Sequence, residues 1–177
     1  MSAQPGSSTR RIIGIDPGSR ITGYALVDAE GGQCAHVASG CLRLPREDLP
    51  VRLKTIFEEL GQIIAEHHPD EMAIEQVFVS RNPSSAIKLG QARGAAICAG
   101  AAAHLEVAEY SAAEIKQAIV GRGHADKQQI QHMVKVLLNL QGRIQADAAD
   151  ALAVALTHAQ ISHTRRKSGV QLGRRAR

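Results

Sequence analysis

The sequence predicts an α/β fold built on a mixed five-stranded sheet flanked by helices. Its first part contains three short, β-branched or alternating segments separated by glycine-containing turns, a pattern typical of an antiparallel meander. Later, short apolar segments alternate with longer ones whose apolar residues recur at helical spacing. Because strand–helix–strand units pair their strands in parallel, the antiparallel first three strands are expected to share one sheet with a parallel portion.

The expected elements can be placed along the chain. The opening strands are expected at 11–16, 21–28 and 33–44. The later elements are a helix at 48–67, a strand at 72–75, a helix from 83 to about 104, a strand at 106–110, and helices at 111–121, 126 to about 140 and 146–163. Three of the helix starts carry local signals: Asn82 before Pro83, and the capping-box pairs Ser111 with Glu114 and Asp126 with Gln129.

Length and composition limit the class of protein. The 177 residues, 44% hydrophobic and 21% charged, are sufficient for one domain with a core of its own. We expect a disordered leader at 1–10, a folded domain at 11–163 and a basic, disordered tail at 164–177. The longest uncharged apolar stretch, residues 94–103, is far shorter than the ~20 residues of a membrane span. With no signal-like apolar core near the start and three cysteines without metal-ligand spacing, the sequence predicts a cytoplasmic protein with reduced thiols.

Charge is distributed unevenly along the chain. Residues 165–177 carry six Arg or Lys and no acid, and residues 76–146 carry eight against four acids. A basic middle and a basic tail on an otherwise acidic chain indicate a polyanionic partner. For the tail alone, a solvated end without a binding role is an equally good interpretation.

Four carboxylates stand out by their positions. Asp16 ends the first expected strand, before a Pro-Gly turn, and Glu75 ends the fourth. Asp147 and Asp150, three residues apart, share one face at the start of the last helix. Taken singly, each also has a structural interpretation: an Asx turn at the first, an ion pair at the second, and a favourable helix-dipole position for the last two.

Taken together, the four acids indicate a metal site. If the two strands are neighbours and the last helix packs on them, the carboxylates converge and repel one another unless cations lie among them. Oxygen ligands without His or Cys select Mg²⁺ or Mn²⁺. Two such ions about 4 Å apart suit the hydrolysis of a phosphodiester bond.

Four segments carry a resemblance to a known family. They are IIGIDPGSR at 12–20, AIEQVF at 73–78, KLGQARG at 88–94 and QADAADALA at 145–153. In order and spacing they resemble the RuvC family of bacterial Holliday-junction resolvases, which have a ribonuclease H-like fold. The resemblance spans roughly residues 11–163 and leaves the leader and the basic tail outside it.

The resemblance implies a function and assigns roles to residues. It implies a homodimer that resolves four-way DNA junctions by paired symmetric nicks during homologous recombination and DNA repair, working with the RuvA–RuvB branch-migration complex. It implies two Mg²⁺ ions per active site, with Mn²⁺ as a substitute. The catalytic, metal-binding acids would be Asp16, Glu75, Asp147 and Asp150.

The resemblance also implies DNA contacts. Phe78 would stack on a base near the exchange point, and Lys116 and Lys127 would lie near the scissile phosphate. From the residues alone, a core position is the commoner fate of a Phe such as Phe78, although the nearby acids and Arg81 make stacking on an unpaired base reasonable. Lys127 follows a glycine-containing loop, which could either bind a phosphate or be an ordinary surface loop. On the residue pattern alone, Lys116 would be solvated.

Other functions fit parts of the pattern. The segment at 13–19 also resembles the first phosphate loop of actin-like and sugar-kinase ATPases, but those folds need two such domains and the chain has no GxxxxGK[ST] loop. A junction-binding scaffold with inert acids, or an RNA-cleaving relative, remain alternatives. The helix at 83–104 is rich in Gly and Ala, so we expect it to pair with its counterpart in the dimer, with Ala95 on its outer face.

Overall fold

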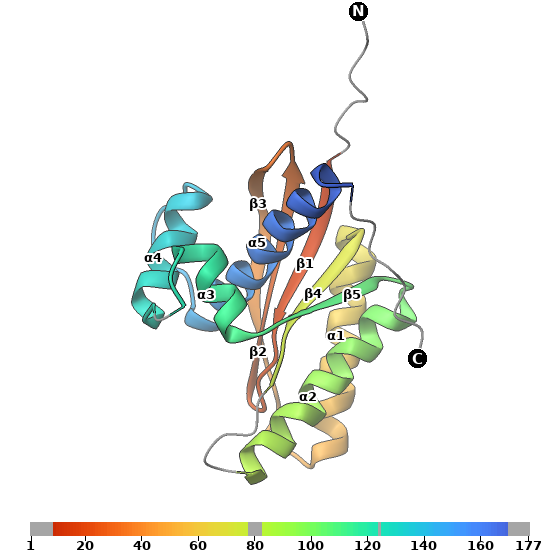
Figure 1. Cartoon of the computed structure of the whole chain (residues 1–177). Coiled ribbons are helices and arrows are strands. Elements are labelled where there is room, and N and C mark those ends of the chain that lie inside the picture. The colour runs from red at the N-terminus through yellow and green to blue at the C-terminus, as the bar shows by residue number, and fades with distance from the viewer. Residues whose placement is uncertain (1–8, 78–82, 124, 170–177) are drawn as a thin grey trace, which may run out of the picture.

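The computed structural model describes residues 9–77, 83–123 and 125–169, and these form a five-stranded sheet in the order β3-β2-β1-β4-β5 (Figure 1). β1 pairs antiparallel with β2, and β2 with β3. β4 pairs parallel with both β1 and β5. The predicted mixed sheet with three antiparallel first strands is thus confirmed. The strands are β1 Arg10–Asp16, β2 Ile21–Glu30, β3 Gln33–Arg43, β4 Glu71–Glu75 and β5 Glu106–Tyr110.

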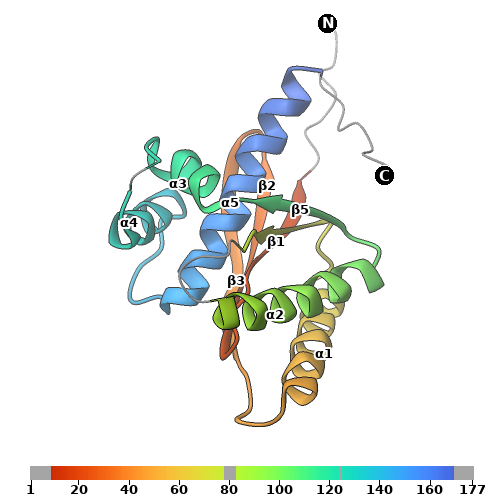
Figure 2. The same cartoon turned by 60° about the horizontal axis from the view of Figure 1, so that its bottom comes forward.

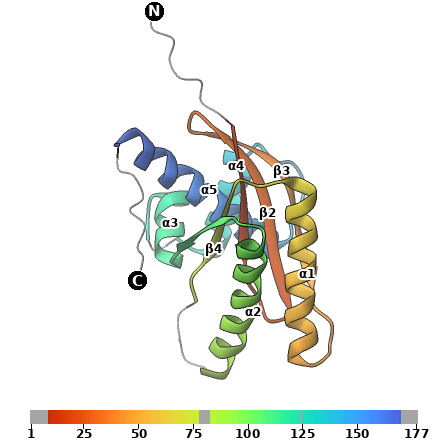
Figure 3. The same cartoon turned by 90° about the vertical axis from the view of Figure 1, so that its right-hand side faces the viewer.

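Helices cover both faces of the sheet. Two of them lie on one face and three on the other, and each group encloses its own hydrophobic core (Figure 3). In Figure 2, α5 runs along the sheet with α3 and α4 beside it. The helices are α1 Leu49–His67 and α2 Pro83–Ala102 on the first face, and α3 Ala112–Val120, α4 Lys127–Leu137 and α5 Ala146–Lys167 on the second.

The alternation of β1 decides which face its last residue joins. Ile13 and Ile15 lie in the core under α1 and α2, whereas Ile12 lies in the core under α5. Because successive side chains of a strand point to opposite faces, Asp16 falls on the α5 face with Ile12. The period of two therefore directs this carboxylate toward the helix that carries the two late aspartates.

The helix α5 packs against the backbone of the sheet. A Cβ atom added at Gly14 of β1 would lie 2.7 Å from Ala155 N and 2.8 Å from Ala155 Cβ, and it would also clash with the carbonyl oxygen of Ala151. A Cβ atom added at Gly23 of β2 would clash with the carbonyl oxygen of Asp147. These two glycines are required because α5 lies too close to the strands for any side chain.

We expect Gly14→Ala to lower the free energy of unfolding by about 1–3 kcal/mol, the usual range for overpacking, because the atoms it meets are mostly backbone that cannot rotate away. Denaturant unfolding measures this effect. Gly61→Ala, in the interior of α1 with nothing within 4 Å of the added Cβ, is the matched control. It should raise stability by about 0.5–1 kcal/mol. Equal effects of the two substitutions would contradict the close packing.

The ends of the helices follow local signals with a few differences. Both predicted capping boxes are present, with Ser111 capping α3 and Asp126 capping α4. α4 ends at Leu137, before the expected 140, because the chain turns through the left-handed region at Asn139 (φ 49°). α5 continues to Lys167, four residues beyond the expected end, so the start of the expected disordered tail is helical.

The ends of the chain were expected to be disordered, and most of their residues lie outside the described ranges. Of the leader, Thr9 donates to Glu30 and Arg10 begins β1. All three cysteines lie within the described residues and are free. No helix within the described residues is long and apolar enough to span a membrane.

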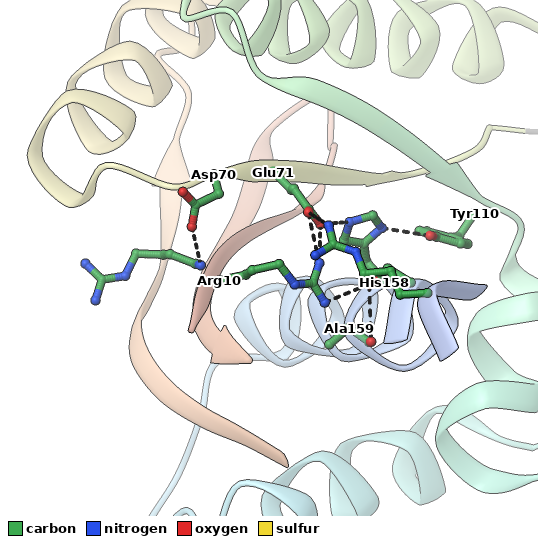
Figure 4. Close-up of polar contacts among 9 residues, drawn as sticks. Arg10, Asp70, Glu71, Tyr110, His158 and Ala159 are labelled. Carbon is green, nitrogen blue, oxygen red and sulfur yellow. Dashed lines mark hydrogen bonds and ion pairs between the residues drawn. The ribbon is translucent and has the colours of Figure 1, made fainter. Parts of the chain in front are cut away.

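A partly buried ionic network joins β1, β4 and α5 at the amino-terminal end of β4 (Figure 4). The carboxylate of Glu71 accepts hydrogen bonds from Arg10 Nη1 at 2.7 and 2.9 Å, from Arg166 Nη2 at 2.6 Å and from His158 Nε2 at 2.6 Å. The other ring nitrogen of His158 meets the Tyr110 hydroxyl at 2.8 Å. The hydrogen bond from His158, followed by those from Arg10, lowers the pKa of Glu71 to about 2. The contact with Arg166 lies in the part of α5 that extends past His163.

Candidate active site

The parallel pairing of β1 and β4 brings the first two acids together. Ile15 is paired with Ile74, so Asp16 and Glu75 occupy the next position on adjacent strands, where both strands end. The carboxyl ends of parallel strands are the usual location of functional residues in open α/β sheets. The two acids, 59 positions apart in the sequence, therefore lie side by side.

The start of α5 adds the other two acids. Asp150 lines the same cavity of about 380 Å³ as Asp16 and Glu75. Asp147 lies one turn earlier, where its carbonyl oxygen contacts Gly23 of β2, and its carboxylate interacts electrostatically with Asp16. The structure thus places three of the four acids that the sequence singled out in one cavity, with the fourth, Asp147, close enough to Asp16 to influence its pKa.

Burial and mutual repulsion raise the pKa values of the inner acids. The pKa of Asp16 rises to about 8, first because of burial and then because of the negative charges of Asp150, Glu75 and Asp147. Burial, followed by the charge of Asp150, also raises the pKa of Glu75. The site therefore holds more negative charge than its surroundings compensate, which is the condition that a bound cation relieves.

Two lysines supply the positive charge at this cavity. Lys127 Nζ forms an ion pair of 2.6 Å with Asp150 Oδ2, and this contact raises the pKa of Lys127. Lys116 of α3 lines the same cavity, and its charge partly offsets the rise in the pKa of Glu75 that burial and Asp150 cause. Its partly buried position differs from the solvated one that the residue pattern alone suggested.

The structural interpretations of Asp16 and Glu75 find no support, whereas Asp147 does lie in the first turn of α5, where the helix dipole favours a carboxylate. No hydrogen bond of the Asp16 side chain is found among the described residues, and the turn that follows is held by Thr22, whose Oγ1 bonds both the N and the O of Gly18. Glu75 forms no ion pair with any part of the chain that the structure describes. Among the described residues, neither carboxylate is therefore used in a structural hydrogen bond or ion pair.

The four carboxylates have the chemistry that a divalent metal ion prefers in its ligands. Their oxygen-only chemistry, their burial and their uncompensated charge fit Mg²⁺. As the side chains stand, however, no three potential ligands within the described residues are gathered closely enough to hold an ion. One contact works against such a gathering, because Lys127 holds the carboxylate of Asp150 in an ion pair.

Sequence reasoning missed one residue that supports the site. Arg93 of α2 donates from Nε to the carbonyl oxygen of Glu75 at 3.1 Å and pairs with Glu109 of β5 at 2.6 Å. It thereby fixes the end of β4 to its neighbours. The segment at 88–94 was noticed, but nothing in it indicated this partner. Phe78 and Arg81, expected to contact DNA, lie outside the described residues.

Comparison with known proteins establishes the family. The model of the family described as crossover junction endodeoxyribonuclease RuvC matches residues 12–158. The chain belongs to the RuvC family. This match spans the resembling segments up to Ala153 and replaces the ATPase alternative. The RuvC of Dichelobacter nodosus is 58% identical over 154 residues, which cover 87% of this chain and 88% of that protein. The RuvC of Marinobacter nauticus is 56% identical over 153 residues, covering 86% and 87%.

Solved structures of RuvC have the same fold. Thermus thermophilus RuvC superposes with a TM-score of 0.80 at 31% identity, covering 87% of this chain and 96% of that one. The same protein in complex with a Holliday junction substrate gives a TM-score of 0.82 at 30% identity, covering 91% and 97%. The yeast mitochondrial Holliday junction resolvase shares the fold with a TM-score of 0.65 at 11% identity, covering 94% and 88%. The expected ribonuclease H-like fold is thereby confirmed.

Proposed function

We propose that this RuvC-family chain is a Mg²⁺-dependent endonuclease that resolves four-way DNA junctions by paired symmetric nicks in homologous recombination and DNA repair. The observation that carries the proposal is the cavity in which Asp16, Glu75 and Asp150 meet two lysines at the end of β1 and β4. Relatives covering most of this chain are named crossover junction endodeoxyribonucleases, which supports the choice of substrate.

The four acids would hold the metal ions. The chemistry that two Mg²⁺ ions would supply there is the activation of water and the stabilisation of the leaving oxygen of a phosphodiester. Mn²⁺, with similar ligand preferences, is the expected substitute. The chain itself contributes positive charge: the ammonium groups of Lys116 and Lys127 line the cavity and would attract and orient the scissile phosphate. Phe78 would stack on an unpaired base and Arg81 would contact the backbone beside it.

The enzyme is proposed to act as a homodimer, because two symmetric cuts need two sets of acids. Its interface would lie on α2, where Ile87 is 63% exposed and the positions of Gly90 and Gly94 are open to solvent. The expectation that Ala95 lies on the outer face of this helix was wrong. Ala95 is partly buried against the core that α2 shares with α1.

We expect Ile87→Glu to convert the dimer into a folded monomer, because it places a charge in the centre of the proposed apolar contact. Light scattering at micromolar concentration, with and without junction DNA, measures the mass. Ala65→Glu, at an exposed position of α1, is the control and should leave the mass unchanged. A wild-type protein that is monomeric both alone and on the junction would contradict this arrangement.

One experiment tests the function as a whole. The protein is incubated with four-way, duplex and single-stranded DNA, and with RNA hybrids, each with and without Mg²⁺. Cutting of the four-way junction alone, dependent on Mg²⁺ and symmetric in two strands, supports the proposal. Binding without cutting supports a scaffold with inert acids, and preferential cutting of RNA supports an RNA-cleaving relative. The RuvA–RuvB complex as partner and the bacterial cytoplasm as location belong to the same proposal.

A further inference from the structure

A second cavity, separate from the acid cavity, is lined by arginines. It has a volume of about 590 Å³ and lies between the β1–β2 turn, the end of β3 and the first turns of α1. The lining contains four guanidinium groups and a single carboxylate, that of Glu47. The four belong to Arg20, Arg43, Arg46 and Arg52. We call this the arginine cavity.

The positive charge of the arginine cavity is not neutralised from within. Arg20, Arg43 and Arg46 are exposed, and within the described ranges none of the four arginines forms an ion pair. Arg52 donates from Nη1 to the carbonyl oxygen of Ser19 at 3.1 Å, but its Nε is buried without a hydrogen-bond partner. The cavity is therefore lined by one partly buried guanidinium that is hydrogen-bonded to the backbone and by three exposed ones.

The neighbouring helix end adds to this field. α1 begins beside the cavity, and its first turn contains no acidic residue. The side chain of the N-cap residue Asp48 makes no hydrogen bond to the helix. The free N–H groups at a helix start carry partial positive charge and favour an anion. Glu47 and Asp48, the acids nearby, leave the local balance positive.

The strand register places the arginine cavity close to the acids. Asp16 is paired with Gly23, and Gly23 with Cys41, so these three residues form one row across the sheet. Arg43 lies two residues beyond Cys41, toward the same end of the sheet. With strands about 4.8 Å apart and a rise of about 3.3 Å per residue, its Cα lies about 12 Å from that of Asp16. A few nucleotides of one DNA strand span this distance.

We propose that the arginine cavity is a phosphodiester-binding subsite, which holds a backbone phosphate of the strand being cut, a few nucleotides from the scissile phosphate. Guanidinium groups bind phosphate oxygens with two parallel hydrogen bonds, which suits a site that positions the backbone without reading sequence. The position beside the acids favours nucleic acid over an acidic protein. The inference rests on the proposed function only in taking DNA as the polymer.

The first test compares the salt dependence of binding without divalent metal, so that no strand is cut. Arg43→Gln and Arg46→Gln should each lower the slope of log affinity against log salt by about 0.9, the value for one phosphate contact on duplex DNA. Lys54→Gln is the matched control: it removes one positive charge from an exposed position of α1 outside the cavity. Slopes equal to that of the control would overturn the proposal.

The second test locates the phosphate. Neutral methylphosphonates are placed one at a time along the strand that is cut, and binding is measured for the wild type and for Arg43→Gln. One position a few nucleotides from the cut should weaken wild-type binding and have no further effect in the variant. If inorganic phosphate competes with DNA equally well at the arginine cavity and at the acid cavity, the arginine cavity is instead a simple anion site. No sensitive position would overturn the subsite.

The two proposals can fail independently. If the protein does not cut four-way junctions but the arginine variants still lose salt dependence, the proposed function fails and the subsite stands. If cutting is normal and the arginine variants match Lys54→Gln, the subsite fails alone. Both variants should remain folded, because the two arginines are exposed and unpaired among the described residues.

Discussion

Asp16→Asn is expected to lower the rate of junction cleavage by at least about 10³-fold, which corresponds to about 4 kcal/mol of transition-state stabilisation. The amide keeps the shape of the side chain but removes the charge that lies among the other three acids. Binding to the junction should change little, because phosphate contacts supply most of it. Single-turnover cleavage and a binding titration measure the two effects separately.

The same substitution should stabilise the metal-free protein. The folded-state pKa of Asp16 is about 8, above its usual value of 3.8, so the folded state holds a proton that the unfolded state has lost between these pH values. Stability contributed by this group is therefore present below about pH 4 and decreases as pH rises toward 8. Asp16→Asn removes this loss of stability at high pH. At pH 8 the free energy of unfolding of the variant should therefore exceed that of wild type by roughly a few kcal/mol.

Glu66→Gln, an exposed carboxylate on α1, is the control for both measurements and should leave cleavage and stability unchanged. Added Mg²⁺ should stabilise wild type more than Asp16→Asn, since only wild type retains the full set of carboxylates. Near-wild-type cleavage by Asp16→Asn would remove this residue from the catalytic site.

Glu71→Ala is expected to be the most destabilising of the substitutions considered, by about 3–5 kcal/mol. Its carboxylate is 14% exposed and is the shared acceptor for Arg10 and His158, whose side chains are 13% and 7% exposed. Removing it leaves a buried guanidinium without its ion pair and frees the end of α5 at Arg166. Denaturant unfolding at pH 7 gives the change, with Glu66→Ala as the exposed control.

The dependence on pH distinguishes the charge from the packing of Glu71. Its pKa is lowered from 4.5 to about 2 in the folded state, so its stabilising contribution is present above about pH 4.5 and is lost as pH falls toward 2. Wild type should lose stability in that window, and Glu71→Ala should lose less. Parallel pH profiles for the two proteins would show that the ionic network contributes nothing.

Much of the fold and of the candidate site follows from local sequence. The period of two in β1 and the capping boxes at Ser111 and Asp126 predict their elements because each signal lies within a few residues. Asp16 and Glu75 were found because each ends an apolar strand, where a charged side chain is costly unless it has a partner or a functional role.

What the sequence could not predict depends on contacts between distant segments. Glu71 and His158 are 87 residues apart, and neither carries a local signal. The arginine cavity collects its side chains from a turn, a strand end and a helix, so no spacing identifies it. Lys116 looks solvated on its own helix and is drawn into the site only by the packing of α3 against α5.

The backbone contact between α5 and the sheet determines how the site responds to its own charge. At Gly14 and Gly23 no side chain lies between the helix and the strands, so the backbone of α5 packs directly on the backbone of the sheet. With α5 held against the strands, burial and then the charges of the neighbouring acids raise the pKa of Asp16, so that this carboxyl retains its proton. The close contact between helix and sheet thus sets the protonation state of Asp16, and a cation that binds here has to displace this proton and separate Asp150 from Lys127.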